Sequence, residues 1–388
     1  MLALASGCGG LGKKAGDASH TDLSGADSTT SGPDTARLAT DTLPPDAGAT
    51  TSNDASASPG ADGQVIPGAY DGGTGSEVAA PSPATIIVLP DTQYYTFVPS
   101  PDPLGVPYTK VFAMQTNWIL AQKASLNIQA VLHVGDLVEV GGDPNQWNLA
   151  GTAMHSLDGI VPYVVVPGNH DCDATRFGLM DSYFGPATMP WITSTMITGQ
   201  MENSYALITI GGQQWLVVAI EFGPRDAVVT WADQVLKAYP RMPAILLTHA
   251  YLYSDGTRYD LAVAGKNSDT QGFQWWYPES YLFTPSQGIN DGEMMWQNLV
   301  LPNSNVRMVF SGHQTGWARL SSGRPDGTVA HQMLSDYQWL DGPHFGYGYL
   351  RIVQLDYAKK TIQVQTYSPY LDQYLTDDAN QFTLDWNL

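Results

Sequence analysis

The stretch VPYVVVPGNHD, residues 161–171, joins an apolar, valine-rich run to an abruptly polar end. A short run of this kind bounded by proline and glycine predicts a buried strand that ends in a turn. Asn169, His170 and Asp171 then stand at the carboxyl end of that strand. Since ligands of α/β sheets bind in the crevice outside these ends, the three residues are candidates for a functional site.

Four other apolar runs end in an aspartate or a histidine in the same way. They are TIIVLP (85–90) before Asp91, IQAVLHV (128–134) before Asp136, PAILLTH (243–249) ending in His249, and VRMVFSG (306–312) before His313. One such coincidence is common by chance, and five are not. The pattern predicts that these residues share one rim, whereas His133, inside its run, is predicted to be structural.

The order of apolar patterns along the chain predicts the fold class. Helical patterns separate several of the strands, as at residues 110–124, 231–239 and 292–300, and residues 316–368 have the pattern of successive strands. Alternating strands and helices followed by more strands predict a mixed α/β sandwich that forms one domain of roughly 300 residues.

The residue types at the strand ends are those of a metal site. Carboxylate, imidazole and amide oxygen suit a small ion of borderline hardness such as Zn, Mn or Fe. Paired ions about 3.5–4 Å apart clamp a phosphate and lower the pKa of a bound water, which makes a nucleophile near neutral pH. The rim is therefore predicted to hold metal and to hydrolyse a phosphate compound.

The ordered motifs resemble those of the calcineurin-like metallophosphoesterases. They are Asp91, GD (135–136), GNHD (168–171), His249 and GH (312–313). Alone, GD or a single histidine is a weak signal, but the ordered set, spread over residues 84–320, is a strong one. The resemblance implies a four-layer αββα sandwich of two mixed sheets in residues 84–388.

The resemblance also implies a role for each rim residue. Asp136 would bridge two ions, Asp91 would bind the first ion, and the second ion's ligands would be completed by Asn169, His249 and His313. His170 would protonate the leaving oxygen, which suits an imidazole that titrates near neutral pH. Asp171 would orient the ligands. The alternative for each residue is structural: a turn former, a helix cap or a hydrogen-bonded core histidine.

Two positions depart from the family pattern, and both concern the first ion. Gln93 stands where a histidine two residues after Asp91 is usual, and GHQT places Thr315 where the last histidine of Gly-His-x-His is usual. Glutamine offers an amide oxygen and threonine a hydroxyl, both harder and weaker donors than imidazole. We expect one or two divalent or trivalent ions, Mn, Fe or Zn, with Gln93 as a ligand and with Mg or Ca possible at the altered site. Loss of the first ion is the alternative.

Residues 1–83 differ in composition from the rest of the chain. They are rich in Ala, Gly, Ser, Thr, Asp and Pro, which predicts a disordered linker before the domain of residues 84–388. LALASGCGG (2–10) resembles a bacterial lipoprotein cleavage box with lipid on Cys8, and hence a signal peptide and membrane attachment. The positively charged region expected upstream is missing, so a start before Met1 would be needed, and a chance cluster is the alternative.

Charge and cysteine content exclude several classes of protein. The net charge of −20 argues against a protein that binds nucleic-acid duplexes, because an acidic protein surface repels phosphates. Two cysteines, Cys8 and Cys172, exclude a disulfide framework. Arg319 and Arg351 are candidates for neutralising a phosphate, with a structural role as the alternative.

Together these features predict an extracytoplasmic, lipid-anchored or secreted phosphoester hydrolase of the bacterial envelope. Its substrate would be a small phosphorylated compound, and it would act as a phosphomonoesterase or a phosphodiesterase. The alternatives are a non-catalytic or single-metal surface binding protein on the same scaffold and a hydrolase of a non-phosphoester bond. Intact Asp136 and His170 favour catalysis.

Overall fold

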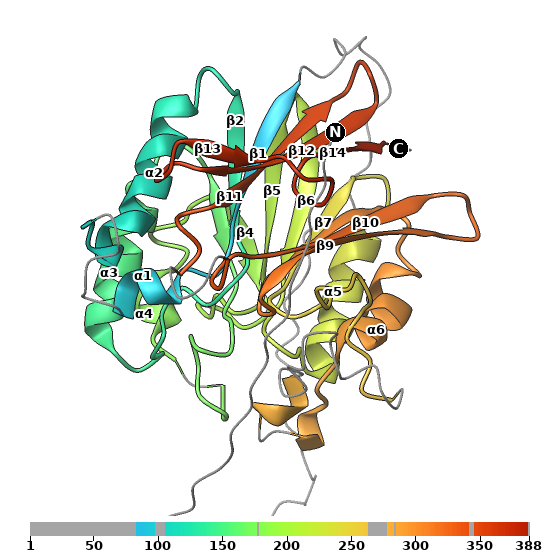
Figure 1. The fold of residues 1–388 in the computed structure, drawn as a ribbon. Coiled ribbons are helices and arrows are strands. Elements are labelled where there is room, and N and C mark those ends of the chain that lie inside the picture. The colour runs from blue at the N-terminus through green and yellow to red at the C-terminus, as the bar shows by residue number, and fades with distance from the viewer. Residues whose placement is uncertain are drawn as a thin grey trace, which may run out of the picture. The chain divides into compact units, whose positions relative to one another are not determined.

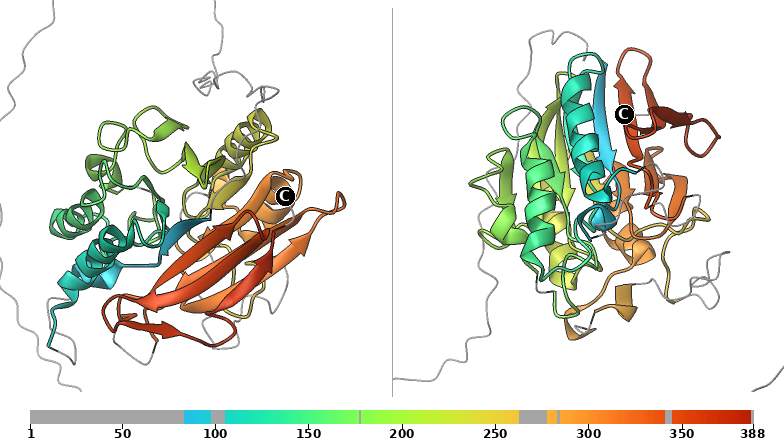
Figure 2. Two further views of the ribbon diagram at one scale, coloured as in Figure 1. Left: turned by 90° about the horizontal axis from the view of Figure 1, so that it is seen from above. Right: turned by 60° about the vertical axis from the view of Figure 1, so that its left-hand side comes forward.

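Two mixed sheets of seven strands each form the middle of the molecule (Figure 1). The computed structural model describes residues 83–97, 105–176, 178–262, 278–282, 285–340 and 345–386. Helices lie on the outer faces of the two sheets, as the two further views in Figure 2 show. The predicted sandwich of two mixed sheets is confirmed, whereas the predicted linker of residues 1–83 and the lipid site at Cys8 lie outside the described residues, apart from Pro83.

The first sheet has the strand order β13-β12-β11-β1-β2-β3, and β14 also pairs with β12. Strands β1, β2 and β3 run parallel, while β11 pairs antiparallel with β1. The strands are β1 (Ala84–Leu89), β2 (Ile128–His133), β3 (Tyr163–Val165), β11 (Leu350–Asp356), β12 (Thr361–Ser368), β13 (Gln373–Leu375) and β14 (Phe382–Asp385).

The second sheet has the order β4-β5-β6-β7-β8-β10-β9. Its strands β6, β7, β8 and β10 are parallel, and β9 returns antiparallel to β10. The strands are β4 (Ile192–Thr195), β5 (Ser204–Ile210), β6 (Gln213–Ala219), β7 (Ala244–Leu247), β8 (Val306–Ser311), β9 (Gly316–Gly323) and β10 (Val329–Asp336).

The described helices are mostly short. They are α1 (Gln93–Phe97), α2 (Val111–Gln122), α3 (Pro144–His155), α4 (Met180–Tyr183), α5 (Asp226–Ala238), α6 (Gly292–Met295), the π-helical η4 (Trp296–Val300), and the 3-10 turns η1 (Tyr108–Lys110), η2 (Pro278–Ser280) and η3 (Pro285–Gln287). Helix α3 begins where its sequence favours a start, because Asp143 accepts a hydrogen bond from the Asn145 N–H and Pro144 follows the cap. In the described part of the chain, no helix is long and apolar enough to span a membrane.

Both faces of each sheet are apolar because one face packs against the other sheet and the opposite face packs against helices. Along β6, residues 215, 217 and 219 pack toward the first sheet, and residues 216 and 218 pack against α5. Strands buried on both faces need near-continuous apolar runs, which is the pattern that the sequence shows. Helices α2 and α3 cover the first sheet in the same way, through buried residues such as Phe112 and Trp147.

The predicted rim is built by two sheets rather than one. Strands β1, β2 and β3 of the first sheet carry Asp91, Asp136 and Asn169 just past their carboxyl ends, and β7 and β8 of the second sheet carry His249 and His313. The two sheets meet at this edge, where the His313 N–H after β8 donates to Asp91 Oδ2 after β1 at 2.9 Å. The strand ends therefore converge across the sandwich.

Candidate metal centre

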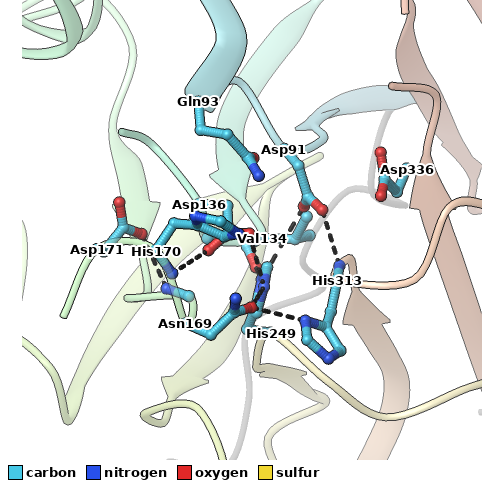
Figure 3. A network of polar contacts seen from close by, with 12 residues as sticks. Asp91, Gln93, Val134, Asp136, Asn169, His170, Asp171, His249, His313 and Asp336 are labelled. Atoms are coloured by element: carbon cyan, nitrogen blue, oxygen red, sulfur yellow. Dashed lines mark hydrogen bonds and ion pairs between the residues drawn. The ribbon is translucent and has the colours of Figure 1, made fainter. Parts of the chain in front are cut away.

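The structure brings the predicted metal ligands together at the edge shared by the two sheets (Figure 3). One ligand atom each from Asp91, Asp136 and His249 lie within 4.8 Å of one another. Asn169 Oδ1 lies 3.1 Å from His249 Nε2 and 2.7 Å from His313 Nδ1. All five residues therefore surround one small volume, as their order in the sequence predicts.

His249 directs its second ring nitrogen, Nε2, toward this volume. Its Nδ1 donates to the Val134 carbonyl at 2.7 Å, which ties the second sheet to the loop after β2. In the neutral ring the lone pair is then on Nε2, which lies 3.3 Å from Asp136 Oδ2 and close to Asn169 Oδ1. Acceptor atoms thus face one another, which is favourable only when a positive charge lies between them.

The residues present fit a metal ion. One buried carboxylate, one amide oxygen and two imidazoles are the donors that Zn, Mn or Fe takes in proteins. Asp91 Oδ1 is shielded from solvent and has no hydrogen-bond partner among the described residues, although a buried carboxylate oxygen needs one. Its nearest ionic neighbour is His249 Nδ1 at 3.9 Å.

Two glycines, Gly168 of GNHD and Gly312 of GH, are required because carboxylates of the centre lie close to their backbone. A Cβ on Gly168 would lie 2.0 Å from Asp136 Oδ1, and a Cβ on Gly312 would lie 2.1 Å from Asp91 Oδ1. Any side chain at either position would push a carboxylate out of the centre. The glycines of GNHD and GH are therefore part of the site's geometry and not only of its turns.

Two ligands adopt left-handed backbone conformations that are unusual for residues other than glycine. Asp136 has φ 52° and His313 has φ 74°. Such conformations cost about 1–3 kcal/mol each and persist where the surrounding structure holds them. Here the holding contacts include the His313 N–H, which donates to Asp91 Oδ2 at 2.9 Å, and the His170 N–H, which donates to Asp136 Oδ1 at 2.9 Å.

Burial and neighbouring charges set the pKa values at the centre in opposite directions. Burial raises the pKa of Asp91 well above its usual value, and Asp336 and Asp136 raise it further. Burial alone would also raise the pKa of Asp136, but His249 and His170 outweigh it and lower the pKa. The pKa of His249 is raised, because Asp136 outweighs the opposing effect of burial.

His170 lies at the more open side of the centre and is held by Glu139. Its side chain is 33% exposed, and its Nδ1 lies 3.1 Å from the Glu139 carbonyl and 3.4 Å from the Glu139 carboxylate. Burial lowers the pKa of His170, but Asp136 and Glu139 raise it more, so the pKa of the ring is above its usual value. The sequence analysis missed Glu139, whose only signal is its position three residues after Asp136.

The altered first site contains a third buried carboxylate that the sequence analysis also missed. Asp336, at the end of β10, lies beside Asp91 (Figure 3) and is fully buried. Its signal in the sequence is weak, because the stretch HQMLSD before and including this aspartate is mostly polar. Gln93 is buried as well, and its Oε1 accepts a hydrogen bond from the Gln338 side chain, which leaves one lone pair of that oxygen for an ion.

Asp171 and His133 support the centre without facing it. Asp171 accepts hydrogen bonds from the N–H groups of Val138 at 2.9 Å and Gly168 at 2.8 Å, so it clamps the two ligand loops together. His133 bonds Thr92 at 3.0 Å through Nε2, and burial lowers its pKa to about 3. The ring is therefore neutral, in agreement with the structural role expected for it.

The two candidate arginines do not reach the centre. Arg351 is buried and donates to the Tyr337 hydroxyl at 2.9 Å, and Arg319 stacks on Phe382 at 4.2 Å. A cavity of about 380 Å³ lies beside the GNHD loop and is lined in part by Arg176 and Arg225.

Both arginines of this cavity are paired with one carboxylate. Glu221 lies 3.3 Å from Arg176 and 2.8 Å from Arg225. Phe222, which also lines the cavity, packs against the rings of His249 and His313. Since both arginines are paired with Glu221, they do not supply the positive charge that the buried carboxylates of the centre need.

Comparison with known proteins agrees with this geometry. A family model described as calcineurin-like phosphoesterase matches residues 85–315. The uncharacterized protein YvnB of Bacillus subtilis (strain 168) is 32% identical over 323 residues, which are 78% of this chain and 22% of that protein. The chain thus spans less than a quarter of the length of that relative. It belongs to the calcineurin-like phosphoesterase family.

Solved structures of similar fold include two phosphatases. The purple acid phosphatase PPD1 from yellow lupin (Lupinus luteus) has a TM-score of 0.46 and 15% identity, over 79% of this chain and 54% of that one. A dimetal phosphatase from Danio rerio has a TM-score of 0.47 and 11% identity, over 78% of this chain and 99% of that one.

The metal-free protein is predicted to lose stability between pH 6 and pH 8. Burial raises the pKa of Asp171 and of Asp336 to about 7. A carboxyl whose pKa is higher in the folded than in the unfolded state contributes stability that is complete below about pH 4 and is lost as the pH rises through 7. His133 acts in the opposite direction, but its effect ends near pH 6.5, where the unfolded ring titrates.

Thermal unfolding in the presence of a chelator measures this effect. The Tm should be lower at pH 8 than at pH 6 by roughly 5 °C or more, since about 1 kcal/mol shifts the Tm of a large domain by ~2–4 °C. Saturating Mn²⁺ should reduce the fall, because metal binding strengthens as its ligands lose protons. A metal-free Tm that rises over this range would contradict the assignment.

Replacing Asp171 by Asn is predicted to loosen both ligand loops. The amide keeps one acceptor but turns a donor toward the second N–H group, which leaves a buried donor unpaired at a cost of about 1–3 kcal/mol. Differential scanning calorimetry should show a lower Tm than for the wild type, and titration should show weaker Mn²⁺ binding. The exposed Asp173→Asn is the control, and equal Tm values for the two variants would refute the clamp.

Proposed function

We propose that this chain hydrolyses a phosphoester of a small substrate at the metal centre. The observation that carries the proposal is the buried convergence of Asp136, Asn169, His249 and His313 beside His170, whose pKa is raised. Membership of the family supports phosphoester hydrolysis in general. The mechanism, the substrate class and the location given below are part of this proposal.

The protein residues would divide the work between binding and proton transfer. When bound, one or two ions would supply a water of lowered pKa and positive charge for the phosphate. Asp136 would hold that charge from a buried position, and its lowered pKa keeps it ionised at neutral pH. Asn169, His249 and His313 would fix the direction from which the phosphate is bound.

His170 would donate the proton that the leaving oxygen needs. With one ring proton directed from Nδ1 to the Glu139 carbonyl, the second proton of the imidazolium is on Nε2. Transfer of this proton to the departing alkoxide leaves a neutral ring, whose orientation Glu139 maintains. An acid with a pKa near the working pH suits this step.

The charge of the protein favours a small substrate. The net charge is −20, and Asp136, whose pKa is lowered, adds negative charge at the centre. Such a field repels a long polyanion at every phosphate but a compact phosphomonoester or phosphodiester only once. Attachment through lipid on Cys8 at the outside of a bacterial cell remains part of the proposal.

A panel of phosphate esters tests this function. We expect turnover of nitrophenyl mono- or diesters with at least one of Mn, Fe, Zn, Ni or Mg. His170→Ala should lower kcat by roughly 10²–10⁴-fold without changing the metal content. The loss should be larger for alkyl than for nitrophenyl esters, since nitrophenolate leaves without a proton.

Two further results decide between catalysis and mere binding. His155→Ala, on α3 and outside the centre, is the matched control and should retain wild-type turnover. Asp136→Ala should lose both turnover and metal. If the wild type binds metal but hydrolyses no ester in the panel, the proposal fails and a binding protein on the same scaffold is favoured.

A further inference from the structure

We propose that Asp336 is a ligand of the first ion and that it makes this half of the centre an all-oxygen site for a hard ion. The inference rests on the metal centre of the proposed function but not on hydrolysis. Nothing in the usual pattern of motifs contains this residue. It follows from the strand pairing, the burial and the unpartnered oxygens around Asp91.

The pairing of β9 with β10 places Asp336 at the position where an imidazole is missing. Asp336 is the cross-strand partner of Gly316, the residue directly after Thr315. Directly paired residues of an antiparallel ladder lie about 4.5–5.5 Å apart, which is within the reach of an aspartate side chain. The backbone of Asp336 therefore lies opposite the residue that directly follows the threonine in place of the usual last histidine.

Three shielded oxygens near Asp91 have no partner in the described part of the chain. They are Asp91 Oδ1, Asp336 Oδ2 and the Thr315 hydroxyl Oγ1. Asp91 is 3% exposed and Asp336 is 0% exposed, so water does not satisfy either carboxylate from outside. Two ionised carboxylates are acceptors only, so the pair needs either a shared proton or a cation, and a cation is the partner that serves both groups when both are ionised.

Gln338, in the turn after β10, contacts both Asp336 and Gln93. The backbone N–H of Gln338 donates to Asp336 Oδ1 at 3.0 Å, and its side chain donates to Gln93 Oε1. The first contact occupies one oxygen of Asp336 and leaves Oδ2 for another partner. Gln338 therefore fixes the carboxylate and the amide with respect to one another.

The charge of this group requires compensation. Among the described residues, neither Asp91 nor Asp336 forms an ion pair with lysine or arginine, and His249 is the nearest cationic group to Asp91. Isolated buried carboxylates are strongly unfavourable. In this chain the carboxylate of Asp336 and the neutral oxygens of Gln93 and Thr315 take the place of two imidazoles. The added negative charge of Asp336 compensates for the weaker binding of a cation by the two neutral oxygens.

The donor set selects the kind of ion. Asp91, Asp136, Asp336, Gln93 and Thr315 offer only oxygen, and oxygen ligands suit Mn, Mg or Ca better than Zn. The second ion keeps its two imidazoles, so it retains a preference for Zn or Fe. The two ion sites therefore differ in the hardness of their ligands. A titration of the protein with different metal ions measures this consequence of Asp336.

Equilibrium binding of Mn²⁺ to the full chain tests the inference. The wild type should bind two ions, and Asp336→Asn should bind about one, with affinity at the first site reduced at least tenfold. The ion kept at the second site shows that the variant is folded. Asp356→Asn, at the end of β11 and paired with Lys359 at 2.9 Å, is the matched control and should bind two.

A second variant decides the question independently of the first. Asp336→His restores an imidazole, so it should bind two ions and shift the first site's preference from Mn²⁺ toward Zn²⁺. Two ions of unchanged affinity in Asp336→Asn, or an unchanged preference in Asp336→His, would overturn the inference. Because ions and not turnover are counted, failure of the proposed hydrolysis would leave this result intact.

Discussion

The structure depends on a set of buried acceptor atoms that face one another across the edge shared by two sheets. Asp91 and Asp136 come from the first sheet, His249 and His313 from the second, and Asn169 Oδ1 contacts both imidazoles. Burial of two carboxylates at this edge is unfavourable unless a proton or a metal ion compensates their negative charge. A metal ion at this edge would therefore both carry the chemistry and hold the two halves of the sandwich together.

This constraint explains features that are costly elsewhere. Asp136 and His313 have left-handed backbone conformations, and two glycines lie where there is no room for a Cβ. Both features would destabilise an ordinary turn. Here they bring carboxylates and imidazoles closer than side chains on regular strands could come. The Asp171 clamp then keeps the two loops in place, so local strain is offset by hydrogen bonds a few residues away.

The sequence predicted the parts of the site that depend on local patterns. Asp91, Asp136, Asn169, His249 and His313 each follow an apolar run, and the fold aligns such ends. That two sheets share the rim was not predictable from runs alone, because it depends on pairing between distant strands. Asp336 shows the same limit: the stretch before it contains His331, Gln332 and Ser335 and is not a continuous apolar run, and its place beside Asp91 comes from β10 lying between β8 and β9. Glu139 acts only through its contact with His170.

The most direct test of the account is the metal content of protein purified without a chelator, measured by plasma mass spectrometry for the wild type and for Asp91→Ala. Asp91 serves only the first ion in this account. We predict two ions per wild-type chain and about one per variant chain. A wild type without stoichiometric metal, or a content that Asp91→Ala leaves unchanged, would contradict the claim that buried acceptors at this edge are built around two cations.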